Sequence, residues 1–385
     1  KQEERPPLRQ AYSEGVVNDY TKLKVPPQFS KVYDLRTLVG VGTTSKVYLC
    51  VRRATGERYA CKVLDKRRLK IGDNDGETLL TQLRREIDIM RALNHPNIAR
   101  FEDVVETADS IYYVMELVTG GEMFDHLLEH GSFLEKEAAH ITHGVMSAAS
   151  YMHRLGVVHR DLKAENLLLV HRGELLPSAK IIDFGFSTQL DYNLAGSFLG
   201  TGGYIAPEIR QLKQYSQAVD VWALGVLVYL MVSCRLPFNA DVGILPLESE
   251  EVEMRYKLKF PEAQWAEKSE EVKELLRHML DPNPSTRWSA EQVLRHPWVT
   301  GEVFGTVFPP VAVPDLDNEW ASSGSSSLGG GGGRPRPPLS PACCSRCSGG
   351  GGASATAAAA AVAAAGDDEA TGVSTSLPGE CTCER

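Results

Sequence analysis

The spacing of hydrophobic residues changes once along this chain, and the change separates two kinds of secondary structure. Between residues 33 and 115, short apolar runs favour strands, interrupted by one segment, 79–93, whose apolar positions recur at helical spacing. From residue 122 onward the pattern is mainly helical, as in Ala138–Arg154 and Ala218–Val232. The pattern therefore predicts an α+β fold with a strand-rich first part and a helical second part.

Both ends of the chain are predicted to lie outside a folded domain that spans residues 33–300. Residues 1–32 are polar and marked by prolines, which favours either an arm over the first part or disorder. Prolines between residues 301 and 320 oppose a helix. From about Ala321, Gly, Ser, Pro and Ala dominate, and such segments cannot bury enough surface to offset chain entropy. Residues 301–385 are therefore predicted to be a low-complexity, disordered tail.

Two short motifs carry the candidate chemistry. The run His159-Arg160-Asp161-Leu162-Lys163-Ala164-Glu165-Asn166 is followed by Asp183-Phe184-Gly185. Phosphoryl transfer from ATP to a hydroxyl requires this set of an acid, a cation and two metal-binding side chains. Asp161 is predicted to orient the hydroxyl and accept its proton, and Lys163 to steady the phosphoryl oxygens. Asn166 and Asp183 offer the hard oxygen ligands that suit Mg²⁺.

A glycine-containing segment between two apolar runs is a candidate phosphate-binding loop. The runs, 33–39 and 47–51, are predicted to pair as a hairpin. Glycines at its tip would let backbone N–H groups approach phosphates, although a Gly-x-Gly hairpin is more often purely structural. The candidate nucleotide-binding residues here are Val39, Gly40, Val41, Gly42, Thr43, Thr44, Ser45 and Val47.

Lys62 lies inside the apolar strand predicted over Tyr59–Leu64. A lysine in such a strand is costly unless its ammonium has a partner. Glu86, on the predicted helix 79–93, is the expected partner, and the pair would hold Lys62 against the α- and β-phosphates. The alternative is a surface lysine and an ordinary solvated glutamate.

With these motifs in order, the chain closely resembles the eukaryotic protein kinases from about Tyr33 to Val299. The resemblance includes Ala206-Pro207-Glu208, the run Asp220-Val221-Trp222-Ala223-Leu224-Gly225-Val226, and Arg287. It implies a bilobal fold with an N-lobe over 33–115, a hinge over 116–121 and a C-lobe over 122–300, and it implies ATP and Mg²⁺ as cofactors. In the family, Glu208 and Arg287 form a buried ion pair, and Asp220 bonds to the backbone of the catalytic loop.

The resemblance also assigns residues around the adenine. Met115 fills the gatekeeper position, and the hinge-side nucleotide contacts fall on Glu116, Val118 and Glu122. Val47, Ala60 and Leu168 match the residues that sandwich the base. A second stack, which aligns in active kinases, matches Met90, Phe101, His159 and Phe184. Ser45 departs from the pattern because it replaces the third loop glycine.

Two residues point to the serine/threonine type. Lys163 follows the catalytic aspartate as it does in serine/threonine kinases, and Thr201 matches the threonine that bonds to the catalytic aspartate and lysine. Within the family, the chain is most similar to the calcium/calmodulin-dependent and AMP-activated kinase group. The motifs for this are Gly120-Gly121-Glu122-Met123-Phe124, Leu236-Pro237-Phe238, His296-Pro297-Trp298-Val299 and Lys163-Ala164-Glu165-Asn166.

Charge bears on the expected partners. The formal net charge is −9 over 385 residues, which makes nucleic acid or an anionic membrane an unlikely default partner and suits basic protein substrates. Glu122 and Glu165 match family positions that read arginine upstream of the acceptor; otherwise they are plain surface glutamates. Gly202 and Gly203 replace commoner residues near the substrate loop, so the acceptor-flanking preference is open.

Regulation is expected through the segment between Asp183 and Glu208. Arg160 matches an arginine that often pairs with a phosphate there, and Ser197 is the first choice for the phosphorylated residue, ahead of Ser187, Thr188 and Thr201. An upstream activating kinase would then be a partner. The alternative is an unmodified, constitutively ordered loop.

Calcium control is not supported by the sequence. Asp73-Asn74-Asp75-Gly76 superficially resembles a calcium loop, but Ile71 stands at the first ligand position and Gln82 at the twelfth. No basic amphipathic helix of the calmodulin-target kind follows Val299. Val221–Ser233 is too short to span a bilayer, and no signal peptide is visible. With no disulfide framework indicated among the eight cysteines, a cytoplasmic location is expected, with the nucleus allowed.

The sequence therefore predicts an active protein serine/threonine kinase. A pseudokinase scaffold, which binds partners without turnover, usually lacks the lysine or an aspartate, and none is lost here. A small-molecule kinase is disfavoured by Ala206-Pro207-Glu208 and by the two peptide-reading glutamates.

Overall fold

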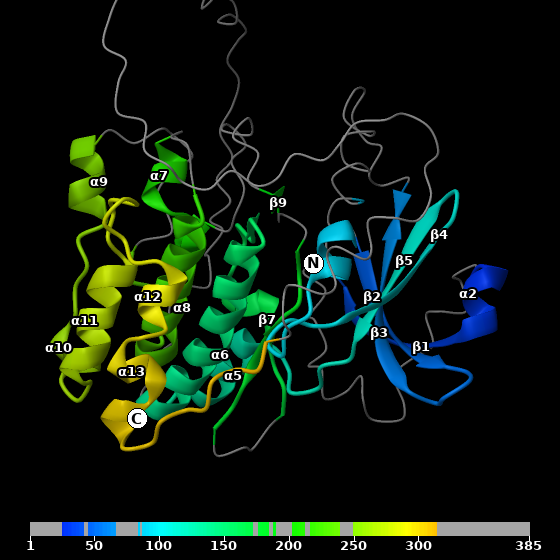
Figure 1. The fold of residues 1–385 in the computed structure, drawn as a ribbon, viewed down its shortest axis with the longest axis horizontal. Helices are drawn as coiled ribbons and strands as arrows, with labels where there is room; N and C mark the ends of the chain where they lie inside the picture. The colour runs from blue at the N-terminus through cyan, green and yellow to red at the C-terminus, as the bar shows by residue number, and fades with distance from the viewer. Residues whose placement is uncertain are drawn as a thin grey trace, which may run out of the picture. The chain divides into compact units, whose positions relative to one another are not determined.

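The computed structural model describes residues 25–41, 45–66, 84, 87–171, 176–184, 188–189, 202–211, 216–238 and 249–313. Within this part of the chain, a five-stranded antiparallel sheet precedes a mainly helical region (Figure 1). The predicted α+β, bilobal fold is confirmed. The helix predicted over 79–93 is described only at residue 84 and over 87–93; residues 84 and 87–92 are helical, and Leu93 is not.

The small lobe is built on a sheet with strand order β1-β2-β3-β5-β4. Neighbouring strands pair antiparallel; for example, Val47 lies opposite Lys62 and Ala60 opposite Met115. β1 pairs antiparallel with β2, with Tyr33 opposite Arg52 and Val41 opposite Lys46, so the predicted hairpin is present. The strands are β1 (Tyr33–Val41), β2 (Ser45–Arg52), β3 (Arg58–Asp65), β4 (Phe101–Glu106) and β5 (Ser110–Glu116).

Both faces of this sheet are buried, because side chains alternate between them along each strand. On one face, Ala60 and Tyr113 join the main core, which includes Met90. On the other face, Cys61 and Tyr112 belong to a second core that the short helix α2 (Pro27–Val32) covers. At its centre lies Phe29 of α2, which is 0% exposed.

The large lobe is centred on two long helices, α6 (Glu135–Arg154) and α8 (Ala218–Ser233). All of α8 beyond Ala218 is buried, which is why its sequence is apolar on every side. Gly225 allows close packing, since a Cβ there would lie 2.9 Å from Leu280 Cδ2. No helix in the described part of the chain is long and apolar enough to cross a bilayer.

Smaller elements complete the large lobe. The catalytic region holds β6 (Val157–Val158), β7 (Leu167–Leu169), β8 (Ala179–Ile181), β9 (Thr188–Gln189) and two 3-10 turns, η2 (Ala164–Asn166) and η3 (Gly202–Tyr204). The peripheral elements are α5 (Met123–His130), α7 (Pro207–Arg210), α9 (Ser249–Arg255), α10 (Glu262–Trp265), α11 (Glu270–Met279), α12 (Ala290–Val293), α13 (Pro297–Thr300) and η4 (Glu302–Phe304).

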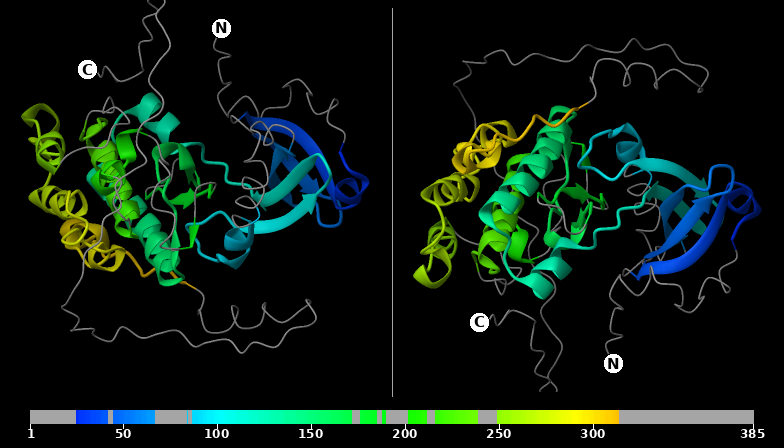
Figure 2. Two further views of the ribbon diagram at one scale, coloured as in Figure 1. Left: turned by 90° about the horizontal axis from the view of Figure 1, so that it is seen from above. Right: turned by 90° about the horizontal axis from the view of Figure 1, so that it is seen from below.

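Packed structure extends beyond residue 300. After η4, the segment 305–313 lies beside α6, where the Phe308 ring is 4.9 Å from His140, and Phe308 is only 4% exposed (Figure 2). The backbone N–H of Phe308 donates to Thr300 at 2.7 Å. The segment is not helical, as its prolines predict. Residues 314–385, where most of the predicted tail lies, fall outside the described residues.

Candidate active site

The loop between β6 and β7 brings three of the predicted residues together. Lys163 Nζ lies 2.8 Å from Asp161 Oδ2. The amide of Asn166 donates to the same carboxylate oxygen at 3.0 Å and to the Asp161 backbone carbonyl at 2.8 Å. The turn η2 allows this, because it folds Asn166 back over Asp161. Asp161 is only 7% exposed, and these contacts hold its carboxylate in one orientation.

Asp220, near the start of α8, anchors the backbone of this loop. Its Oδ2 accepts from the backbone N–H of His159 at 2.9 Å and its Oδ1 from that of Arg160, also at 2.9 Å. His153 Nε2 is 2.8 Å from Oδ2. Burial raises the pKa of Asp220, but the hydrogen bond and charge of His153 and the backbone hydrogen bond of His159 outweigh burial, and the pKa lies below its usual value. The predicted role of Asp220 is confirmed.

Lys62 reaches across the lobes to Asp183. Its Nζ lies 3.0 Å from Asp183 Oδ1, and the lysine side chain is 18% exposed. Asp183 follows β8, and its neighbour Ile182 donates from its backbone N–H to Asn166 at 3.1 Å. Lys62, Asp161, Asn166 and Asp183 therefore lie in one connected group of contacts. The sequence identified Lys62 and Asp183 separately but not their contact.

The stack predicted for active kinases lies in the main core. The His159 ring is 4.8 Å from Phe184, and both are almost completely buried. Burial lowers the pKa of His159, so its imidazole is neutral in this stack. Met90 is 1% exposed and Phe101 packs on the same core.

Several of the predicted nucleotide residues lie on β1, β2, β3, β5 and the predicted hinge. Val39, Gly40 and Val41 end β1, and Ser45 and Val47 begin β2; a Cβ on Gly40 would lie 3.8 Å from that of Val47. Ala60 and Met115 are paired on β3 and β5, and Val118 is buried just beyond. An antiparallel bridge joins Glu122 to Leu168 on β7.

Gly120 and Gly121 permit a close approach at the end of the hinge. A Cβ on Gly120 would lie 2.1 Å from the backbone oxygen of Leu169, and Gly121 has a φ of 90°. Leu169 also donates from its backbone N–H to the Gly121 carbonyl at 2.9 Å. These two glycines bring β7, with Leu168, against the hinge.

Six predicted site residues lie outside the described part of the chain. They are Gly42, Thr43, Thr44, Glu86, Ser197 and Thr201. The Lys62–Glu86 pair, the tip of the glycine loop and the phosphorylation site therefore stay predictions.

The buried ion pair predicted between Glu208 and Arg287 is confirmed. Two parallel hydrogen bonds join them, from Nη1 to Oε1 at 2.7 Å and from Nη2 to Oε2 at 2.9 Å. Neither side chain is more than 1% exposed. The Arg287 guanidinium also lies over the Trp222 ring, 4.9 Å from its centroid.

The donor set fits Mg²⁺ bound together with a nucleotide. Asn166 and Asp183 supply oxygens from adjacent segments, and Mg²⁺ at such sites takes one or two protein ligands beside phosphates and waters. No group of three or more His, Cys, Asp or Glu residues able to hold a metal occurs in the described ranges.

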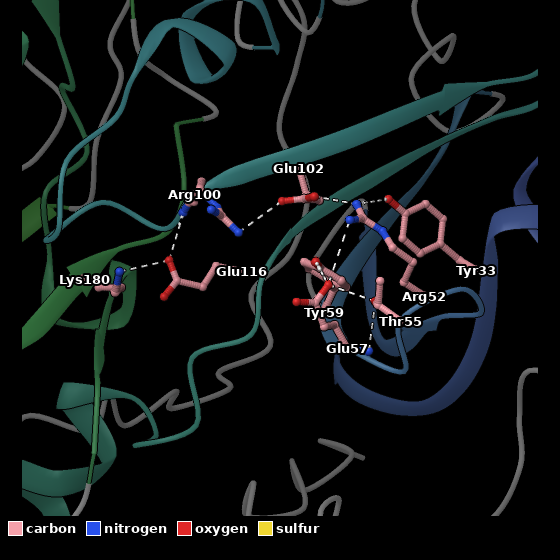
Figure 3. Close-up of polar contacts among 9 residues, drawn as sticks. All are labelled: Tyr33, Arg52, Thr55, Glu57, Tyr59, Arg100, Glu102, Glu116 and Lys180. Atoms are coloured by element: carbon pink, nitrogen blue, oxygen red, sulfur yellow. Dashed lines mark hydrogen bonds and ion pairs between the residues drawn. The ribbon is translucent and has the colours of Figure 1, made fainter. Parts of the chain in front are cut away.

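Sequence reasoning missed Lys180 on β8. Its Nζ is 2.9 Å from Glu116 Oε2, at the first residue of the predicted hinge (Figure 3). The signal that pointed to Lys62 was also present here, because Lys180 interrupts an apolar strand between Ala179 and Ile181.

The chain was compared with known proteins. The family model described as "Protein kinase domain" matches residues 33–299. Calcium/calmodulin-dependent protein kinase type 1B of Homo sapiens is 41% identical over 275 residues, which cover 71% of this chain and 76% of that protein. Calcium/calmodulin-dependent protein kinase type 1 of Caenorhabditis elegans is 37% identical over 284 residues, covering 71% and 78%. Myosin light chain kinase A of Dictyostelium discoideum is 38% identical over 273 residues, covering 71% and 89%.

These matches confirm the resemblance drawn from the motifs. The fold and the arrangement of the site residues agree with this resemblance. Enzymes of this class use ATP as the phosphoryl donor and Mg²⁺ as the cofactor. The chain belongs to the protein kinase family and is a serine/threonine protein kinase close to the calcium/calmodulin-dependent kinase group.

Proposed function

We propose that Asp161 is the residue that orients the substrate hydroxyl and accepts its proton while the γ-phosphoryl group is transferred. The observation that carries this is the contact of one carboxylate oxygen, Asp161 Oδ2, with both Lys163 and Asn166. These two contacts fix the carboxylate, and the second oxygen is left to face an incoming hydroxyl. Lys163 is then placed to steady the phosphoryl oxygens during transfer.

Asn166 and Asp183 are the proposed Mg²⁺ ligands. Bound Mg²⁺ neutralises charge on the phosphate oxygens. The Asn166 amide nitrogen is turned toward Asp161, which directs its carbonyl oxygen away from that residue. Asp183 keeps Lys62 close, so the lysine that we propose to anchor the α- and β-phosphates stands beside the metal ligand. Glu86 is the proposed second partner of Lys62, and Thr201 the proposed partner of Asp161 and Lys163.

The adenine end is assigned to the hinge. We propose that backbone groups of Glu116 and Val118, in the hinge that follows Met115, form hydrogen bonds with the edge of the base. Ala60, Val47 and Leu168 would enclose its faces, and Glu122 would close the outer end. The loop over residues 39–45 is assigned to the phosphates because its glycines leave room for backbone N–H groups.

Substrates are proposed to carry arginine upstream of the acceptor. Glu165 Oε2 is buried, and no protein group in the described ranges bonds to it. We base the substrate role of Glu165 on its match to a family position that reads arginine, where a peptide guanidinium would pair with the carboxylate. Glu122 lies at the start of α5, bridged to Leu168 on the same side of the large lobe. Glu165→Gln should raise the KM of an arginine-directed peptide and leave its alanine-substituted form unaffected.

The central test is ATP and Mg²⁺ turnover on an arginine-directed peptide. Asp161→Asn should lower kcat by at least about a hundredfold, because the proton acceptor is lost. Glu270→Gln is the matched control, since Glu270 is 77% exposed and pairs with Lys273 on α11. Equal rates for wild type and Asp161→Asn would reject the proposed mechanism and reopen the scaffold alternative.

Regulation is proposed to act through phosphate on Ser197 rather than through calmodulin. Arg160, which would face that phosphate, is fixed by Asp220. Two of the relatives are named calcium/calmodulin-dependent, but the segment 305–313, which follows η4 here, is non-helical and packs on α6 through Phe308. Mass spectrometry of active enzyme without phosphate on Ser197, or stimulation by Ca²⁺ and calmodulin, would each contradict this proposal.

A domain order of arm, kinase domain and tail is proposed with boundaries near 33 and 300, together with a cytoplasmic location. The location is proposed because the sequence indicates no disulfide framework among its cysteines.

A further inference from the structure

Lys180 links β8, the strand that ends just before Asp183, to the hinge. It lies on β8, which runs directly into Asp183, while its ammonium is 2.9 Å from the Glu116 carboxylate at the end of β5. The Lys180 side chain is 14% exposed and that of Glu116 33%. This ion pair is therefore partly shielded from water, where charges interact more strongly than at an open surface.

The Glu116 carboxylate is itself held in place from the small lobe. Its Oε2 accepts from the Arg100 backbone N–H at 3.1 Å, and the Glu116 N–H donates to the Arg100 carbonyl at 2.8 Å. Beyond it, Arg100 pairs with Glu102 at 3.3 Å, and Glu102 contacts Arg52 (Figure 3). The carboxylate that meets Lys180 therefore belongs to a charged series that runs across the sheet.

The backbone of β8 is held in place by hydrogen bonds that do not involve the Lys180 side chain. Ile181 accepts from the backbone N–H of Ala99 and donates to the Asn97 carbonyl, both at 2.9 Å. Asn97 Nδ2 donates to the Ala179 carbonyl at 2.9 Å. These bonds hold β8 against the loop 97–99, so loss of the Lys180 side chain alone should leave the strand in place. What Lys180 adds is a side-chain link from β8 to the hinge.

We infer that Lys180 is a positioning residue for nucleotide binding. Through Glu116 it sets the position of the hinge, which meets the base, relative to Asp183, which meets the metal and phosphates. This inference rests on the proposed roles of Asp183 and the hinge. It predicts that breaking the pair weakens binding of the nucleotide, which contacts both ends, more than binding of the peptide.

The test uses the full chain. Lys180→Met keeps the length of the side chain and removes its charge, Glu116→Gln removes the other charge, and Lys180→Arg keeps the pair. We expect the first two to raise the KM for ATP, and the dissociation constant of a non-hydrolysable ATP analogue with Mg²⁺, by at least about fivefold. The peptide KM should stay unchanged, and Lys180→Arg should restore most of the nucleotide affinity.

Lys273→Met is the matched control, because Lys273 is 13% exposed and pairs with Glu270 at 2.8 Å on α11. It should leave nucleotide affinity unaltered. Unchanged affinity in Lys180→Met, tighter binding, or an equal rise in both KM values with a lower unfolding temperature would overturn the inference. Since binding of the analogue needs no turnover, this result is separate from that of Asp161→Asn, which tests the proposed function.

Discussion

Asp220 holds Arg160 in a left-handed backbone conformation. Arg160 has a φ of 69°, and its backbone N–H donates to Asp220 Oδ1 at 2.9 Å. A non-glycine residue in this region costs roughly 1–2 kcal/mol, so a compensating contact is needed. The buried aspartate supplies it at the residue directly before Asp161. Helix α8 of the large lobe thus fixes the backbone direction just before Asp161, the proposed proton acceptor.

Asp220→Asn should therefore impair catalysis more than ATP binding. An amide has one oxygen, so it cannot accept from His159, Arg160 and His153 with the present geometry. Displacement of Asp161 by about 1 Å can cost on the order of a hundredfold in rate, so we expect a kcat loss of about 10- to 100-fold. Steady-state kinetics at saturating ATP measures this, with the exposed Asp88→Asn as control. A folded variant with unaltered kcat would contradict the assigned role.

Breaking the Glu208–Arg287 pair from either side should destabilise the protein strongly. Each partner is almost completely buried, so its removal leaves an uncompensated charge in the interior. Such losses cost about 3–5 kcal/mol. Urea unfolding of Glu208→Gln and Arg287→Met should show them, whereas replacement of both residues should cost less than the sum. Strictly additive losses would show that the two side chains act independently.

The chemistry of the site could be predicted because its residues are close in sequence. Asp161, Lys163 and Asn166 lie within one turn-forming loop, so the motif almost dictates their contacts. Lys62 was found because a charge in an apolar strand demands a partner. Its contact with Asp183 joins distant segments, and spacing along the chain carries no information about that distance.

The packing of the chain ends could not be predicted for a related reason. Phe29 is a single aromatic residue in a polar, proline-containing stretch, without the periodicity that identifies an amphipathic helix. Its partners, Tyr33 and Tyr112, come together only when the sheet has formed. Phe308 is likewise buried by α6 and not by its own neighbours.

Phe29→Ala should uncover the second core of the small lobe. The Phe29 ring lies 5.0 Å from Tyr112 and 5.2 Å from Tyr33, and it is 0% exposed. Removal of a buried phenylalanine side chain typically costs about 3–5 kcal/mol. Thermal unfolding should show the loss, while Val32→Ala, at a position that is 44% exposed, should change stability little. Equal stability of the two variants would mean that α2 does not cap the sheet in solution.

His95 should make the protein less stable in mild acid. Asn97 donates its backbone N–H to His95 Nδ1 at 3.0 Å, so Nε2 carries the proton and donates to Ser147 at 3.1 Å. Protonation of Nδ1 would break the first bond and charge a buried ring. Burial is the main reason that the pKa falls from 6.5 to about 4.

The pH range follows from this pKa. Between pH 6.5 and about 4 the unfolded chain binds a proton that the folded chain does not, so stability is complete above pH 6.5 and falls as the pH drops. The loss amounts to about 3 kcal/mol by pH 4. Urea unfolding across this range should give a shallower pH dependence for His95→Gln than for wild type, whereas His130→Gln, at an exposed site, should follow wild type. Parallel curves for wild type and His95→Gln would assign the acid sensitivity to other groups.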